Sequence, residues 1–158
     1  MSKLSPSEIY EDFISKKIDK SKASELLMSL IENPLELDNQ SRISCLKFLG
    51  LICSKEENVF FFLENLLLSD LNDIVRGNAA NIIIRNFPEQ ALKPIKWALE
   101  HDESDFCLIS IIKSIEKTKY QKLKFLLKSI EYVGFEDKIF FPFGKYQTIN
   151  LSNNNIDN

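Results

Sequence analysis

The chain has 158 residues, of which 44% are hydrophobic and 27% are charged, and its formal net charge is -3. This length and composition fit one soluble domain with an apolar core. The mildly acidic balance argues against general nucleic-acid binding, which needs a basic excess. Four glycines and five prolines are few for the turns of a many-stranded sheet protein, so the composition favours an all-α fold.

The cysteines and the chain start indicate the compartment. Cys45, Cys53 and Cys107 are odd in number and form no C-x-x-C pair. We interpret them as small, reduced core residues. Residues 1–13 contain no apolar segment typical of a signal peptide, and no apolar run approaches the ~18 residues that a membrane span needs. We therefore expect a cytoplasmic protein that does not enter a membrane.

Apolar residues recur at helical spacing in successive segments of the chain. Ser5 and Glu8 form a capping box at the start of the first segment, which runs to about residue 17. Asp19 caps the second segment, and Pro34 ends it. Further helices are predicted at about 39–53, 57–68, 73–86, 90–101, 104–117 and 120–133.

The predicted helix at 57–68 reads ENVFFFLENLLL and is apolar on nearly every side. Because a surface helix has a polar face, we expect this helix to be central. Ser54 and Glu57 fit a second capping box at its start. Gly50, in the preceding helix, suits a close approach of two helices. Pro94 must either lie within the first turn of the helix at 90–101 or kink that helix, because proline lacks the amide that a helix interior uses.

A sequence pattern recurs around residues 70–102. In the middle of this stretch, D-x-N-x-x-V-R-x-x-A-A is formed by Asp70, Asn72, Val75, Arg76, Ala79 and Ala80. A shift of 34 residues towards the N-terminus pairs Asp70 with Glu36, and the same shift pairs Arg76 with Arg42. A shift of 32 residues forward pairs Asp70 with Asp102, although the motif arginine is then replaced by Leu108. Fixed periods of this kind indicate stacked repeats.

This pattern resembles a unit of the HEAT repeat family, most clearly in the middle unit. The resemblance covers roughly residues 20–134 and implies antiparallel helix pairs that stack into an armadillo-type α-α superhelix. It predicts a solenoid of about three and a half helix pairs, as a HEAT-like domain at residues 1–134. In that family, aspartates and arginines of neighbouring units form a ladder along the turns. The ladder residues here would be Asp70 and Arg76, with partial rungs at Glu36, Arg42 and Asp102.

The tail, residues 135–158, has a different character. From Tyr146 to Ile156 it resembles one leucine-rich repeat, L-x-x-L-x-L-x-x-N-x-L, with Tyr146 in the first leucine place. One such unit cannot bury its own core. Two interpretations remain open. The tail is either the start of a leucine-rich array that continues beyond Asn158, or a short extended strand and aromatic plug covering the last helix pair.

No enzyme motif occurs in the sequence. His101 is the only histidine, and with three scattered cysteines it does not assemble into a zinc site. Its place at a helix end favours an interaction with the C-terminal carbonyls. A His101–Cys107 catalytic pair has no third, orienting group in view. We therefore predict no catalytic residue, no cofactor and no metal ligand, and we expect the protein not to be an enzyme.

The candidate partner-binding residues come from the second helices of the predicted pairs, because these helices line the concave surface in HEAT-like solenoids. They are Phe61, Glu64, Lys93, Lys96, Trp97, Lys124 and Lys128. Leu63, Ile95 and Leu126 would point the other way, into the core. Trp97 is the residue to mutate first, since tryptophan is over-represented in interface hot spots. The alternative is that Trp97 packs against the neighbouring unit. Converging lysines would favour an acidic segment of a protein partner.

The expected function is a non-catalytic protein–protein interaction module, a scaffold or adaptor that binds its partner on the concave face of the solenoid. The alternative is a HEAT-like nucleic-acid-binding or lyase-type enzyme with a basic groove. Residues 113–128 carry six lysines against one glutamate, which a solvated helix face also explains. Residues 1–40 carry eight acids against five lysines, and this acidic beginning of the chain argues against a basic groove.

Overall fold

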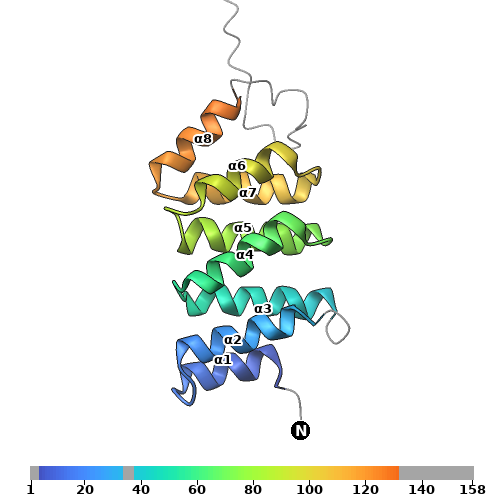
Figure 1. The fold of residues 1–158 in the computed structure, drawn as a ribbon, viewed down its shortest axis with the longest axis vertical. Coiled ribbons are helices and arrows are strands. Elements are labelled where there is room, and N and C mark those ends of the chain that lie inside the picture. Colours follow the sequence, from blue (N-terminus) through green and yellow to red (C-terminus); the bar gives the residue numbers. More distant parts are fainter. Residues whose placement is uncertain (1–3, 34–37, 132–158) are drawn as a thin grey trace, which may run out of the picture.

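The computed structural model describes residues 4–33 and 38–131, and within these ranges the chain is all-α, with helices and no strand (Figure 1). The predicted tail at 135–158, with its leucine-rich pattern, lies outside the described residues, and so does Glu36. The helices of the described ranges are α1 (Pro6–Ile14), α2 (Lys20–Ile31), α3 (Asn39–Ile52), α4 (Glu57–Ser69), α5 (Asp73–Asn86), α6 (Leu92–His101), α7 (Asp105–Lys117) and α8 (Gln121–Glu131). Each predicted helix is present.

Polar caps begin several helices as the sequence predicts. The Ser5 amide donates to the Glu8 carboxylate at 2.6 Å, and the Glu8 amide donates to the Ser5 hydroxyl at 3.3 Å. Asp19 and Ser104 accept backbone amides at the starts of α2 and α7. These side chains satisfy donors that the first turn of a helix leaves without an intrahelical partner.

The predicted capping box at Ser54 and Glu57 is wrong. Glu56 occupies the cap position of α4, and it makes no side-chain capping bond. The reason lies in the preceding turn, where Cys53 ends α3 in the left-handed conformation with φ 53°. After this turn the Ser54 side chain is buried. Cys53 itself is half-buried, whereas Cys45 and Cys107 are core residues as expected.

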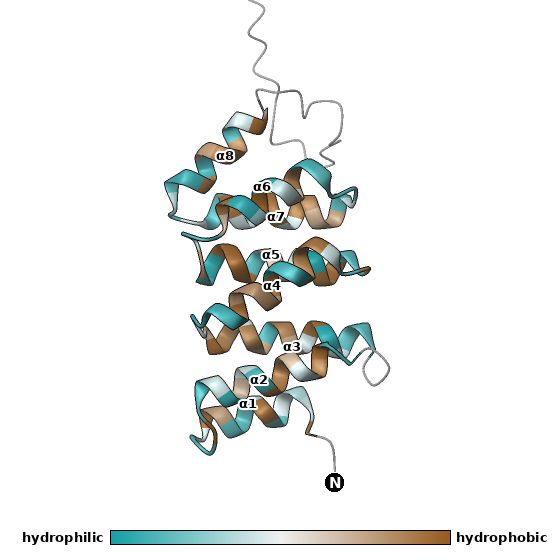
Figure 2. Cartoon of the chain, in the orientation of Figure 1, coloured by the Kyte–Doolittle hydropathy of each residue, from teal (hydrophilic) through white to brown (hydrophobic). Residues whose placement is uncertain are grey.

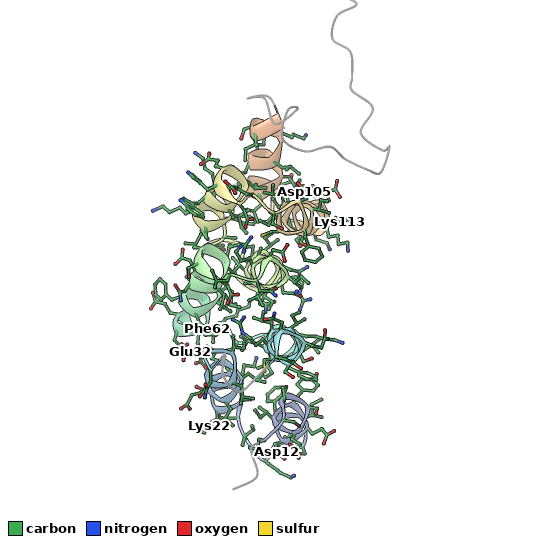
Figure 3. All side chains as sticks on the ribbon, turned by 90° about the vertical axis from the view of Figure 1, so that its right-hand side faces the viewer. Asp12, Lys22, Glu32, Phe62, Asp105 and Lys113 are labelled. Atoms are coloured by element: carbon green, nitrogen blue, oxygen red, sulfur yellow. The ribbon has the colours of Figure 1, made fainter. Side chains whose placement is uncertain are left out.

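The helices stack in two rows, seen in Figure 1 and side-on in Figure 3. One row holds α1, α3, α5 and α7, and the other holds α2, α4, α6 and α8. Each helix contacts the next helix of its own row, and between the rows α2 packs on α3, α4 on α5 and α6 on α7. Because hydropathy alternates along the helices (Figure 2), each can bury one side between the rows.

The core lies between the two rows. Leu63 and Ile95 are fully buried there and Leu126 is nearly so, as predicted. Helix α4 has helices α2 and α6 on either side in its row and α5 against it, but it is not enclosed on every side, because Phe61 is 54% exposed, as its selection as a partner-binding residue anticipated. The helix has neighbours on its α5 side and along its own row, and its remaining side faces solvent. One of the many apolar side chains of this helix, that of Phe61, is therefore exposed.

The row of α1, α3, α5 and α7 is the more closely packed of the two. A Cβ atom at Gly50 of α3 would lie 3.1 Å from Cγ1 of Ile82 on α5. A Cβ atom at Gly77 of α5 would lie 3.1 Å from Cβ of Ser110 on α7. Because glycine has no side chain, α3, α5 and α7 can approach one another closely. Gly50 fits the sequence prediction of a close approach, and Gly77 adds a second.

We predict that Gly77→Leu lowers the free energy of unfolding by about 1–3 kcal/mol, because the added side chain must push α5 away from α7. Urea unfolding followed by circular dichroism measures the change. Asn78→Leu is the matched control at the next position of α5, where the amide bonds only to the carbonyl of Ile74 one turn earlier. We expect a change within about 0.5 kcal/mol for this control. Equal losses in both variants would contradict the close-approach argument.

Candidate functional site

Two arginine–aspartate pairs connect successive turns of the stack. Arg42 of α3 pairs with Asp70, which follows α4. Arg76 of α5 donates from Nε and Nη2 to the two carboxylate oxygens of Asp102, at 2.7 and 2.9 Å. The Asp102 side chain is only 5% exposed. The ladder positions predicted at Arg42, Asp70, Arg76 and Asp102 therefore do form ion pairs.

Arg76 joins the two pairs into one chain of contacts. Its Nη1 donates to the backbone carbonyl of Asp70 at 2.9 Å. On the far side, Asp102 also accepts the backbone amide of Ser104 at 2.9 Å. The turns that follow α4 and α6 are thus held by a single guanidinium. Since both of its carboxylate bonds go to Asp102, the positive charge of Arg76 is neutralised where it lies.

The ion pairs set the ionisation of the groups around them. Burial raises the pKa of Asp102, but the hydrogen bonds from Arg76 and the Ser104 amide lower it, and the net pKa is below its usual value. Burial, reinforced by the Asp102 carboxylate, raises the pKa of Cys107 to about 12. Burial also raises the pKa of Cys45 to about 11. Neither thiol is a thiolate near neutral pH, so neither suits nucleophilic chemistry.

An open pocket of about 300 Å³ lies beside the chain of ion pairs. Residues near the end of α4, residues near the end of α6, the turn residues after each helix and Arg76 of α5 line it. Leu68 supplies an apolar wall, Trp97 an aromatic one, and Glu103 a carboxylate. The pocket therefore combines an apolar surface with charge at the edge of the stack.

Trp97 is held in place by the histidine one turn later. The rings of Trp97 and His101 stack with their centroids 4.6 Å apart and their planes at 14°. Nδ1 of His101 lies 2.9 Å from the carbonyl oxygen of Trp97. His101 is the last residue of α6, which agrees with its predicted place at a helix end. Trp97 still exposes 45% of its surface.

The predicted partner-binding residues all lie on α4, α6 and α8, three successive helices of one row. Five of them are exposed and two are half-buried. The exposed residues are Phe61, Lys93, Lys96, Trp97 and Lys128, and the half-buried ones are Glu64 and Lys124. Among the seven, only Trp97 lines the pocket. The others share its row without forming one cavity.

The pocket also contains residues that the sequence analysis did not select as partner-binding, chiefly Leu68, His101 and Glu103. The sequence does contain a pattern that points to these pocket residues. The shift of 32 residues that pairs Asp70 with Asp102 also pairs Ser69 with His101. It therefore aligns the end of α4 with the end of α6, and so marks the residues around both helix ends as corresponding positions.

Within residues 4–33 and 38–131, no group of three or more histidine, cysteine, aspartate or glutamate side chains is placed to hold a metal ion. No helix of that part is long and apolar enough to cross a membrane. No protein-family model, curated protein or solved structure matches this chain. Function is therefore inferred from the chemistry of the surface described above.

We predict that Arg76→Met lowers the free energy of unfolding by about 2–4 kcal/mol near neutral pH, because Asp102 then remains buried without its cation. The difference in the free energy of unfolding between Arg76→Met and the wild type becomes smaller as the pH is lowered. Pairing lowers the pKa of Asp102 in the folded wild type, so its contribution is present above the ordinary value of 3.8 and is lost as the pH falls through the folded pKa. Unfolding by urea across a pH series measures both effects.

Lys22→Met is the control for the loss of a cation. Lys22 pairs with Glu25 on the surface of α2 at 3.0 Å, and both side chains are more than half exposed. Such pairs contribute little, so we expect no measurable loss at any pH. A loss for Arg76→Met that stays constant down to the acid limit would contradict the role assigned to Asp102.

Proposed function

We propose that this chain is a HEAT-like α-solenoid that binds a protein partner and catalyses no reaction. The observation that carries the proposal is Trp97, which is 45% exposed at the rim of an open pocket. Exposed tryptophans are costly to leave in water and are frequent among interface hot spots. The surrounding stack supplies a firm support, because Ile95, Ala98 and Leu99 of the same helix are buried in the core.

The recurrence of long-range contacts supports the solenoid part of the proposal. The two ion pairs join residues 28 and 26 positions apart. Bonds between the helices of one row span similar distances, with 33 positions between Asn81 and Ser114 and 35 between Arg85 and Gly50. A solenoid connects each unit only to its neighbours, so contacts at a near-constant separation are what its architecture requires.

The docking surface in this proposal is the row of α4, α6 and α8. In a curved stack, the more closely packed row lies on the inner side. The close approaches at Gly50 and Gly77 are both in the row of α1, α3, α5 and α7. The candidate residues would then lie on the outer side, which changes the expectation from the family that they line the concave face.

The charge of this row supports a protein partner with an acidic segment. Lys93 and Lys96 are exposed on α6 next to Trp97, and Lys128 is exposed on α8. Lys96 lies 3.8 Å from Glu100, a distance at which an exposed pair contributes little, so its charge remains accessible to a partner. Complementary charge would steer an acidic segment towards this end of the row.

The same lysines favour the second candidate function, a nucleic-acid-binding or lyase-type enzyme with a basic groove. A pull-down with and without nuclease treatment separates the two. Binding to a protein that survives nuclease treatment supports the interaction module. Binding that disappears with the nucleic acid, or falls steeply with salt concentration, supports the alternative.

We predict that Trp97→Ala abolishes or strongly weakens partner binding while the chain stays folded. Loss of a hot-spot side chain costs about 2 kcal/mol or more of binding free energy, which is roughly a thirtyfold rise in Kd. Partner binding by surface plasmon resonance and unfolding by urea are measured on the same preparation. Loss of the fold would assign Trp97 to the core instead.

Phe106→Ala is the matched control. Phe106 lies on α7, in the other row, and is 47% exposed, so it resembles Trp97 in both aromatic character and exposure. We expect it to leave partner binding unchanged. Equal weakening by the two substitutions would place the docking surface elsewhere or show that the effect is a general loss of stability.

A further inference from the structure

We infer that the pocket between the ends of α4 and α6 binds an arginine side chain of the protein partner. This inference rests on the proposed function, because it names a chemical group that the partner must carry. From the sequence, the charge expected at the binding surface was that of converging lysines, which would favour an acidic partner segment. The pocket has the opposite electrostatic character from those lysines.

The side chains lining the pocket leave one uncompensated negative charge. Arg76 is paired with Asp102, and Asp70 is paired with Arg42. Glu103 is exposed at the pocket and makes no hydrogen bond or ion pair with any residue in the described part of the chain. An incoming anion would meet this carboxylate, whereas a cation would gain a partner.

Two helix ends add to the negative potential. The last residues of α4 and of α6, Ser69 and His101, both line the pocket. The C-terminal end of a helix carries a partial negative charge of roughly half an elementary charge, because its last carbonyls lack intrahelical partners. Since α4 and α6 end at the same place, their partial charges act together with Glu103. This arrangement favours a cation over a neutral group.

The aromatic and apolar walls select arginine among the cations. Trp97 lines the pocket and exposes 45% of its surface although His101 stacks on one face of its ring, so aromatic surface remains for a ligand. A guanidinium stacks on an aromatic face and binds a carboxylate in the same plane. The three methylene groups of arginine can lie against Leu68. Lysine carries a compact, strongly hydrated charge and fits such walls less well.

The size of the pocket agrees with a single side chain. Its volume of about 300 Å³ is at the low end of ligand pockets, and it is open to solvent. A partner can therefore insert one residue while the rest of its segment runs along α6. An acidic stretch beside that arginine would meet Lys93 and Lys96, which are exposed on the same helix.

The test uses the intrinsic fluorescence of Trp97, the only tryptophan in the chain. The full chain is titrated, at constant ionic strength, with three acetylated and amidated pentapeptides of glycine that carry a central arginine, lysine or glutamate. We expect a saturable change with the arginine peptide, binding about threefold weaker with the lysine peptide, and no response to the glutamate peptide. Equal or tighter binding of the glutamate peptide overturns the inference.

Glu103→Gln and Glu116→Gln form a matched pair of variants. Both glutamates are exposed, but Glu116 is on α7 and does not line the pocket. We expect Glu103→Gln to weaken the arginine peptide about fivefold, and Glu116→Gln to leave it unchanged. An unchanged affinity in Glu103→Gln, or equal weakening in both variants, overturns the inference.

Selection of a displayed random-peptide library on the wild-type chain and on Trp97→Ala separates this inference from the proposed function. Enrichment of peptides with a fixed arginine on the wild type alone supports both. Peptides without arginine that still require Trp97 support the proposed function and overturn the arginine inference. If no peptide is enriched on the wild type over Trp97→Ala, both are overturned.

Discussion

The bonds of Arg76 are the contacts on which the pocket depends most directly. This one guanidinium reaches the turn after α4 through the carbonyl of Asp70 and the turn after α6 through the carboxylate of Asp102. The two helix ends therefore lie together, and the open pocket is what remains between them. Because the Asp102 carboxylate is almost fully buried, losing its cation costs far more than losing a surface pair.

The residues that stabilise the stack differ from the residues that give its surface a chemical character. The helices are held by buried residues between the two rows and by close approaches within one row, as at Gly77 and Ser110. Trp97 and Glu103 lie outside this core and are exposed. Exposed residues such as Trp97 and Glu103 can therefore be substituted without disturbing the buried contacts. A surface of this type can acquire specificity through a few exposed side chains while the helices beneath it stay the same.

The candidate docking surface has a positively charged part next to a negatively charged part. Lys93 and Lys96 present positive charge on the flank of α6, while Glu103 and the ends of α4 and α6 make the pocket negative. A partner that matches both must carry acidic residues and an arginine in a defined order. Juxtaposed charges of opposite sign discriminate between partners, since a reversed segment would place like charges together.

Local preferences in the sequence predict the helices and the caps at Ser5 and Asp19, and the resemblance to a repeat places Arg76 and Asp102 among the ladder positions. Three-dimensional packing alone decides that Arg76 pairs with Asp102, that Cys53 ends α3 in a left-handed turn, and that Glu103 shares a pocket with Trp97. The period indicates which positions of the sequence recur. The angles and spacing between helices, which arise from side chains packing in three dimensions, decide which of them are exposed and which lie together.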